Sequence, residues 1–320
     1  MSTKNKRISI IALSVMVLLL LIITGASWYM LDYSLKPQVN KGRDTEAIFK
    51  KVRTEYPYLN HWLDSLTTVH AIHDTSIVAS DGDHHHAVYI RAPHKNNRVA
   101  VVVHGYTDNY VMMLPIAKIY ADMGYNLLLP DLHGNGKSDG NVEQMGWKDR
   151  IDVMQWMDMA NRLFADSTGH TRMVVHGWSM GAATTMCVSG EQLPPYVRCF
   201  VEDCGYTSVW DEFGGQLKEQ FSLPEFPILY SASLLCKLRY GWSFGEASPL
   251  KQIAKCHKPM LFIHGSDDDF VPTWMVYPLF KAKPGVKQLW VAPGSKHARS
   301  LHDHVAEYTR RVTDFVEKYN

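Results

Sequence analysis

The chain lacks an excess of charge of either sign. Its 320 residues carry 33 lysines and arginines against 32 aspartates and glutamates, so no strong field would attract a polyanion. No basic run is interleaved with aromatic residues. These two absences argue against a protein that binds nucleic acid.

Signatures of bound metals and nucleotides are also missing. Neither H-E-x-x-H nor C-x-x-C occurs. Gly136-Lys137-Ser138 looks like the end of a phosphate-binding loop, but Asp131 occupies the place of that motif's first glycine. The run His84-His85-His86 and the pair His302 and His304 are expected to be exposed to solvent, because neighbours in a strand point to opposite faces. We therefore predict no metal and no organic cofactor.

Internal repeats and low-complexity tracts are absent as well. The five cysteines, an odd number, cannot all pair within the chain. With 46% hydrophobic and 20% charged residues, the composition is that of a globular protein with a sizeable core. One large domain is the simplest organisation for this length, and the sequence sets no oligomeric state.

A long apolar run lies close to the N-terminus. From Ile8 to Leu31, about 24 residues pass without a charge, enough to cross a bilayer core of about 30 Å. A secretory signal has a shorter apolar region of about 7 to 15 residues, so the length favours an anchor, although Gly25-Ala26-Ser27 leaves cleavage open. Residues 1–31 are therefore expected to form a cytoplasmic tail and a transmembrane anchor.

The charges around this run predict its orientation. Lys4, Lys6 and Arg7 precede it directly, and positive charge is retained in the cytoplasm. Five basic residues between positions 36 and 51 argue the other way, but long following domains translocate largely regardless of charge. The expectation is a single-pass membrane protein whose main domain lies outside the cytoplasm.

Residues 32–66 are expected to connect the anchor to this domain. Segments 44–52 and 59–66 place apolar side chains at helical spacing, with Pro57 as the break between two packing helices. Segments 76–79 and 87–90 then flank a polar stretch that begins Ser80-Asp81-Gly82-Asp83, a pattern typical of a hairpin.

Short apolar segments alternate with helical ones over the rest of the chain. They lie at 99–103, 126–129, 173–175, 199–201, 260–263 and 289–291, which predicts an α/β domain over residues 67–320 with a doubly wound, mostly parallel sheet. The interval between the fourth and fifth segments is too long for a simple crossover and is rich in aromatic residues. We expect residues 208–245 to form a small cap over an apolar pocket.

Gly177-Trp178-Ser179-Met180-Gly181 is the most informative stretch. It follows the apolar segment at 173–175 and precedes a helix-compatible one, so Ser179 is expected at a sharp turn between a strand and a helix. A serine becomes a nucleophile only when a histidine takes its proton and a carboxylate orients that histidine. Asp268 and His297 each follow a later predicted strand, at the sheet edge where α/β sheets place their sites.

With these motifs the chain resembles the α/β-hydrolase superfamily, from about Thr67 to the C-terminus. His104-Gly105-Tyr106 is similar to the family's H-G-x oxyanion loop, and the segment 131–138 is similar to its D-x-x-G-x-G-x-S turn. The family's H-G-x-x-D-x-x-V-P spacing selects Asp268 among three consecutive aspartates, and its H-A motif selects His297. The nearest likeness is to small bacterial serine hydrolases with a reduced cap, several of which carry an N-terminal membrane segment.

The resemblance implies a membrane-anchored serine hydrolase that cleaves hydrophobic esters or thioesters through an acyl-enzyme. Its catalytic residues would be Ser179, Asp268 and His297, with the backbone N–H groups of Tyr106 and Met180 as the oxyanion hole. A peptidase or an acyltransferase with the same triad stays open, since the fold hosts many chemistries. A non-catalytic binding protein is disfavoured because all catalytic parts are present.

Overall fold

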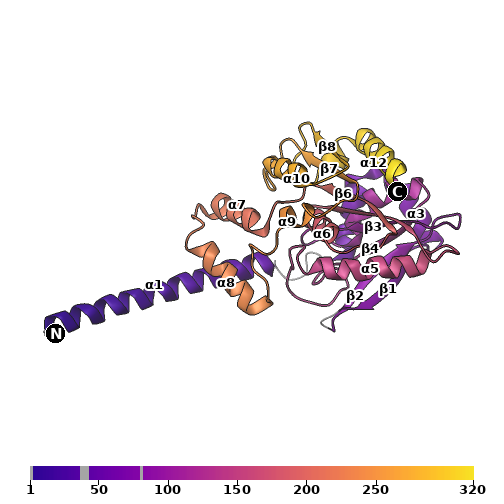
Figure 1. The fold of residues 1–320 in the computed structure, drawn as a ribbon. Coiled ribbons are helices and arrows are strands. Elements are labelled where there is room, and N and C mark those ends of the chain that lie inside the picture. Colours follow the sequence, from indigo (N-terminus) through magenta and orange to yellow (C-terminus); the bar gives the residue numbers. More distant parts are fainter. Residues whose placement is uncertain (1–2, 37–42, 80–81) are drawn as a thin grey trace.

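The protein is described here by a computed structural model that covers residues 3–36, 43–79 and 82–320. Within these residues one sheet of eight strands is flanked by helices on both faces (Figure 1). The strands are β1 (His73–Val78), β2 (His84–Ile90), β3 (Arg98–Val103), β4 (Asn126–Pro130), β5 (Arg172–Trp178), β6 (Val197–Asp203), β7 (Met260–Gly265) and β8 (Lys287–Ala292). The longer helices are α1 (Thr3–Leu35), α2 (Thr45–Glu55), α3 (Asn60–Thr68), α4 (Leu114–Asp122), α5 (Asp149–Phe164), α6 (Met180–Ser189), α7 (Val209–Phe221), α8 (Ile228–Tyr240), α10 (Val276–Ala282) and α12 (Val305–Tyr319). Shorter helical segments are η2 (Pro57–Leu59), η3 (Tyr110–Met113), α9 (Pro249–Ile253), η4 (Thr273–Met275) and α11 (Ser300–Asp303).

The strands lie in the order β1-β2-β4-β3-β5-β6-β7-β8. β2 is antiparallel to both of its neighbours, and all pairs from β4 to β8 are parallel. The predicted doubly wound, mostly parallel sheet is confirmed. The expected hairpin joins β1 and β2, although residues 80–81 of its turn lie outside the described residues.

Two apolar cores cover the two faces of the sheet. In β3, Val101 and Val103 point to the core shared with α5 and α6, whereas Ala100 and Val102 point to the core shared with α4 and α12. This alternation follows from the period of two in a strand, and both faces are apolar because parallel strands are covered on both sides. The central strands end together at one edge of the sheet, which positions the loops described below.

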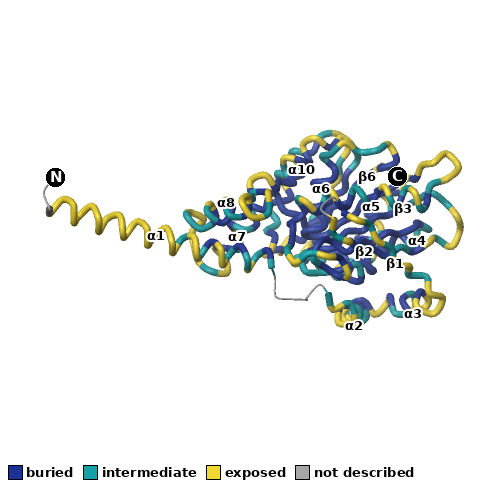
Figure 2. Tube along the Cα trace, turned by 90° about the horizontal axis from the view of Figure 1, so that it is seen from below, coloured by how far each residue is buried: buried dark blue, intermediate teal, exposed yellow. Residues whose placement is uncertain are grey.

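α1 is a single helix that projects away from the body (Figure 1). Its apolar side chains from Ile8 to Ile22 are exposed, whereas Ser27, Leu31 and Leu35 are buried against the rest of the chain. Figure 2 shows this change from exposed to buried residues along the helix. By length and composition α1 can cross a membrane, a criterion that an N-terminal signal sequence also meets.

The segment 208–245 contains α7 and α8, which lie beside the inner end of α1 (Figures 1 and 2). The predicted division of the chain at residues 31 and 66 stays a prediction. α1 differs from the expected anchor by continuing to Leu35, because its last turns pack on α8 rather than leading into a linker. α2 and α3 occupy the region where two packing helices were expected.

Candidate active site

Ser179 lies at a sharp turn between β5 and α6. Its φ of 53° and ψ of −123° are a conformation that L-residues rarely adopt. The flanking glycines permit the turn: a Cβ on Gly177 would lie 2.1 Å from the carbonyl oxygen of Gly181, and one on Gly181 would lie 2.2 Å from that of Val103. Strand and helix can therefore approach closely enough to present the hydroxyl at the sheet edge.

The structure brings the three predicted catalytic side chains into one hydrogen-bonded chain. Ser179 Oγ lies 2.8 Å from His297 Nε2, and His297 Nδ1 lies 2.8 Å from Asp268 Oδ2. They come from the turn after β5, the loop after β7 and the loop after β8, whose ends meet at the same edge of the sheet. This is the arrangement in which a histidine can accept a serine proton while a carboxylate fixes its tautomer.

Asp268 is held through both of its oxygens. Oδ1 accepts hydrogen bonds from the backbone N–H groups of Phe270 and Val271 at 3.1 and 3.0 Å. Oδ2 faces His297 and also lies 3.3 Å from His264 Nε2. Burial alone raises the pKa of Asp268, but the hydrogen bonds from His264 and His297 outweigh it and hold the pKa below its usual value. The carboxyl is therefore ionised at neutral pH.

The neighbouring aspartates point elsewhere. Asp267 and Asp269 are exposed, whereas Asp268 is buried. His264, the histidine of the H-G-x-x-D-x-x-V-P spacing, also contacts the carbonyl oxygen of Val271 at 2.9 Å. It therefore positions the loop that carries Asp268.

The loop after β3 packs against the turn that carries Ser179. A Cβ on Gly105 would lie 3.3 Å from the Cβ of Ser179 and 3.1 Å from Trp178 Nε1, so a larger residue would push these neighbours apart. Tyr106 follows beside the nucleophile. Met180 is the first residue of α6, where backbone N–H groups lack partners within the helix. Both predicted oxyanion donors border the same cavity as Ser179, while their role stays a prediction.

A cavity of about 460 Å³ extends from Ser179 between the cap and α1. This volume is typical of small-molecule sites. α7 and α8 supply one side of the lining with residues such as Phe213, Leu217 and Leu229, and the last turns of α1 supply another with Met30 and Tyr33. The lining is mostly apolar. An apolar pocket was expected from the cap, but α1 as one of its walls was not.

One carboxyl group interrupts this apolar lining. Glu212 on α7 is only 5% exposed. Burial raises its pKa to about 8, and the hydrogen bond of 3.3 Å from Gln216 Nε2 offsets this only in part. Glu212 is therefore protonated at neutral pH, so it adds no negative charge to the pocket.

Another buried carboxyl lies behind the loop of Tyr106. Glu143 accepts hydrogen bonds from the backbone N–H of Thr107 at 3.2 Å and from Asn135 Nδ2 at 3.0 Å. Burial raises the pKa of Glu143 to about 7. Thr107 has a φ of 56°, so this carboxyl stabilises a turn of unusual conformation next to the nucleophile. No sequence pattern identified this contact.

The expectation for the histidine run was wrong. His84 is exposed, but His85 and His86 are buried, because β2 lies inside the sheet with both of its faces covered. His86 bridges Asp131 and Asp74, with its Nδ1 2.7 Å from the first and its Nε2 2.6 Å from the second. His302 and His304 are partly buried.

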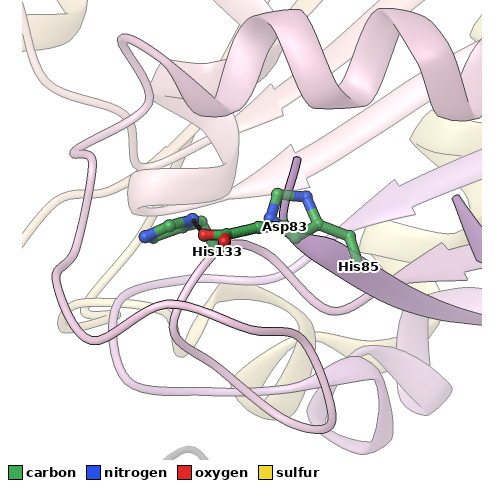
Figure 3. A group of neighbouring side chains, drawn as sticks. All are labelled: Asp83, His85 and His133. Atoms are coloured by element: carbon green, nitrogen blue, oxygen red, sulfur yellow. Dashed lines mark ion pairs between the residues drawn. The ribbon is translucent and has the colours of Figure 1, made fainter. Parts of the chain in front are cut away.

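His85 lies in a second group of polar side chains, which shares no residue with the proposed triad. Figure 3 shows it with Asp83 and His133, each of which offers one ligand atom within 4.8 Å of the others. His85 Nδ1 is also 3.5 Å from Asp152 Oδ2, and His133 Nδ1 is 3.6 Å from Asp83 Oδ2. These residue types can hold a divalent cation, and the same distances suit ion pairs that tie β2 to α5 and to the loop after β4.

Comparison with known proteins places this geometry in a family. The sequence profile of the prolyl oligopeptidase family matches residues 110–320. The uncharacterized protein YqkD of Bacillus subtilis (strain 168) is 30% identical over 233 residues, which are 72% of this chain and 75% of that protein. The uncharacterized protein YfhR of Escherichia coli (strain K12) is 24% identical over 69% of this chain and 71% of its own length.

Solved structures share the fold. The Pyrococcus furiosus esterase Pf2001 superposes with a TM-score of 0.61 at 21% identity, over 78% of this chain and 92% of the esterase. A putative dipeptidyl aminopeptidase IV from Bacteroides ovatus superposes with a TM-score of 0.60 at 19% identity, over 78% of this chain but only 36% of that protein. The fold and the site thus define a serine hydrolase of the α/β-hydrolase superfamily. Within it, the chain belongs to the prolyl oligopeptidase family.

Proposed function

We propose that this protein is a membrane-anchored esterase that hydrolyses carboxylic esters or thioesters of hydrophobic acids. The observation that carries the proposal is the chain of two 2.8 Å contacts from Ser179 through His297 to Asp268, at the base of a mostly apolar cavity. The substrate is a small molecule, since the cavity encloses about 460 Å³.

The acylation step follows from this geometry. Ser179 Oγ attacks the ester carbonyl carbon while His297 Nε2 accepts the hydroxyl proton. Asp268 stabilises the imidazolium, and the N–H groups of Tyr106 and Met180 donate to the oxyanion. When the tetrahedral intermediate collapses, the bond to the alcohol breaks and His297 returns the proton to the leaving alkoxide.

Deacylation repeats these steps with water as the nucleophile. His297 takes a proton from the water, whose oxygen attacks the acyl-enzyme, and then returns that proton to Ser179 Oγ as the acid leaves. The products are one alcohol and one carboxylic acid for each water consumed. None of these steps requires a metal or an organic cofactor.

A labelling experiment tests the proposal. A fluorophosphonate probe is expected to label the wild type, and Ser179→Ala is expected to lose both labelling and hydrolysis of p-nitrophenyl esters. Labelling that persists in the variant would place the nucleophile elsewhere. A series of acyl chain lengths then defines the acyl preference, in which each CH₂ that the pocket buries contributes about 0.8 kcal/mol to binding.

Peptidase activity is the second candidate, favoured by the match to the prolyl oligopeptidase family. A peptide with a free α-amino group would bring a cation into the pocket, where Glu212 is neutral because burial raises its pKa to about 8. A bound ammonium would favour the ionised form of Glu212, whereas an uncharged ester binds beside the neutral form. Dipeptide p-nitroanilides with free and with acetylated N-termini, assayed beside the esters, distinguish the two activities.

A further inference from the structure

The end of α1 is built into the cap. Ser27 Oγ contacts Ser231 Oγ and donates to the carbonyl oxygen of Ile228 at 3.2 Å. Arg239, at the other end of α8, pairs with Asp32 at 2.7 Å and lies 4.5 Å from the ring centroid of Trp28. α8 is therefore fastened to α1 at both of its ends.

α7 and the loop of Tyr106 hold the same part of α1. Tyr33 donates to Gln220 Oε1 at 3.0 Å and packs edge-on against Phe221, with ring centroids 5.5 Å apart. Tyr106 donates to the carbonyl oxygen of Ser34 at 2.8 Å. The helix that forms the apolar segment is thus also a wall of the cavity that contains Ser179.

The length of α1 fixes where this wall lies relative to a bilayer. The segment from Ile8 to Ala26 is uncharged and spans about 28 Å at the rise of an α-helix, close to the thickness of a hydrocarbon core. The next residue, Ser27, hydrogen-bonds to the cap, and Ile23 and Ala26 just before it are already partly buried. Trp28 and Tyr29 are 46% and 62% exposed at this level, as is typical of residues at the membrane interface.

The cap presents an apolar stripe next to this level. Tyr230, Leu234 and Leu238 recur every four residues along α8 and are 54%, 61% and 75% exposed. Phe226, which lies just before the helix, is 71% exposed and packs against Tyr230 with ring centroids 5.7 Å apart. Side chains at this spacing share one face of a helix. Burying four such residues in water-excluding lipid is favourable, and the neighbouring α1 leads directly into the bilayer.

We propose that this stripe, named here the α8 stripe, rests in the bilayer surface and that the cavity takes amphiphilic long-chain esters directly from the membrane. This inference rests on the proposed function and names its substrate class. The acyl chain would enter between α1 and the cap and lie along Met30, Leu229 and Phe213, while the ester carbonyl reaches Ser179. The substrate would pass from lipid to the nucleophile without crossing water.

The test uses the full chain in phosphatidylcholine and phosphatidylglycerol nanodiscs. Two substrates distinguish uptake from the membrane from catalysis at Ser179. 4-Methylumbelliferyl oleate partitions into the bilayer, whereas 4-methylumbelliferyl acetate is soluble. Leu234→Glu/Leu238→Glu alters the α8 stripe but no residue that lines the cavity. The matched control is Val69→Glu/Val78→Glu, which places two charges on exposed residues at the ends of α3 and β1, outside the cap.

The stripe variant is expected to lose oleate hydrolysis by about tenfold or more while acetate hydrolysis stays within about twofold of wild type. The control variant is expected to match wild type on both substrates. Equal rates for the stripe variant and wild type on oleate, or an equal loss on both substrates, would overturn the inference. If the wild type hydrolysed neither ester, the proposed function itself would be wrong.

A second measurement detects contact between the α8 stripe and lipid without an activity assay. All five native cysteines are buried, so a thiol-reactive fluorophore can be directed to an introduced Leu238→Cys. Doxyl-labelled lipids are expected to quench this fluorophore and to leave one at Val69→Cys unquenched. Equal quenching at the two positions would show that the stripe does not contact lipid.

Discussion

The side-chain hydroxyl of Tyr106 donates a hydrogen bond of 2.8 Å to the main-chain carbonyl of Ser34. Ser34 lies in the last turn of α1, where carbonyl groups have no partners within the helix. The next carbonyl, that of Leu35, accepts a hydrogen bond of 2.7 Å from the N–H of Glu143. The end of α1 is therefore joined to the loop that we propose to bind the oxyanion.

Tyr106→Phe removes this bond but keeps the backbone N–H of residue 106. We expect the free energy of unfolding to fall by about 1 kcal/mol, the usual contribution of one hydrogen bond. kcat on a soluble ester is expected to fall by less than about tenfold, since the oxyanion donor is retained. Thermal unfolding and steady-state kinetics measure the two effects. A loss of a thousandfold in kcat would show that the phenol itself takes part in the chemistry.

The three consecutive aspartates provide a test with its own controls. Asp268→Asn is expected to lower kcat by roughly 10⁴-fold, because the amide cannot hold His297 in the required tautomer. Asp267→Asn and Asp269→Asn change exposed side chains and should stay close to wild type. If either exposed aspartate proved the more damaging site in steady-state assays of the three variants, the assignment of the acid would be wrong.

Glu212→Gln tests the charge state of the pocket. The pKa of Glu212 is raised from its ordinary value of 4.5 to about 8, so the folded protein holds the proton more tightly than the unfolded chain. Its free energy of unfolding is therefore expected to decrease as the pH rises from about 4.5 to about 8, because ionisation favours the unfolded state. Glu212→Gln has no carboxyl group at this position, so its free energy of unfolding does not decrease for this reason. Its Tm relative to wild type should therefore rise between pH 5 and pH 8.

The same variant has a kinetic signature. Above about pH 8 the wild type gains a negative charge in an apolar pocket, and its kcat/KM for a long-chain ester should decline. Glu212→Gln should keep its kcat/KM over this range. Parallel pH profiles for the two proteins would show that Glu212 does not titrate in the substrate pocket.

Membrane topology is the fourth prediction. The orientation with Lys4, Lys6 and Arg7 in the cytoplasm places the hydrolase domain outside it. Protease added to intact cells, or to spheroplasts where an outer membrane exists, is expected to digest the domain, and full-length protein is expected in the membrane fraction. Protection until the inner membrane is lysed would reverse the orientation. A soluble product shortened at Gly25 to Ser27 would contradict the anchor.

The sheet and the three proposed catalytic residues could be predicted from the sequence. Ser179, Asp268 and His297 each follow an apolar strand segment, and parallel strands deliver their ends to one edge of a sheet. Residue spacing within each segment was sufficient to predict these positions, because the residues that shape each turn are its neighbours in the sequence. Gly177 and Gly181, which flank Ser179, are an example.

The surroundings of the site could not be predicted from the sequence, because they depend on contacts between distant segments. The wall that α1 forms depends on contacts such as Ser27 with Ser231 and Tyr33 with Gln220, which lie about 190 to 200 residues apart, and no local pattern encodes them. The burial of His85 and His86 depends in the same way on the place of β2 inside the sheet. A period of two indicates which side chains share a face of a strand, but the elements packed on that face decide whether it is buried.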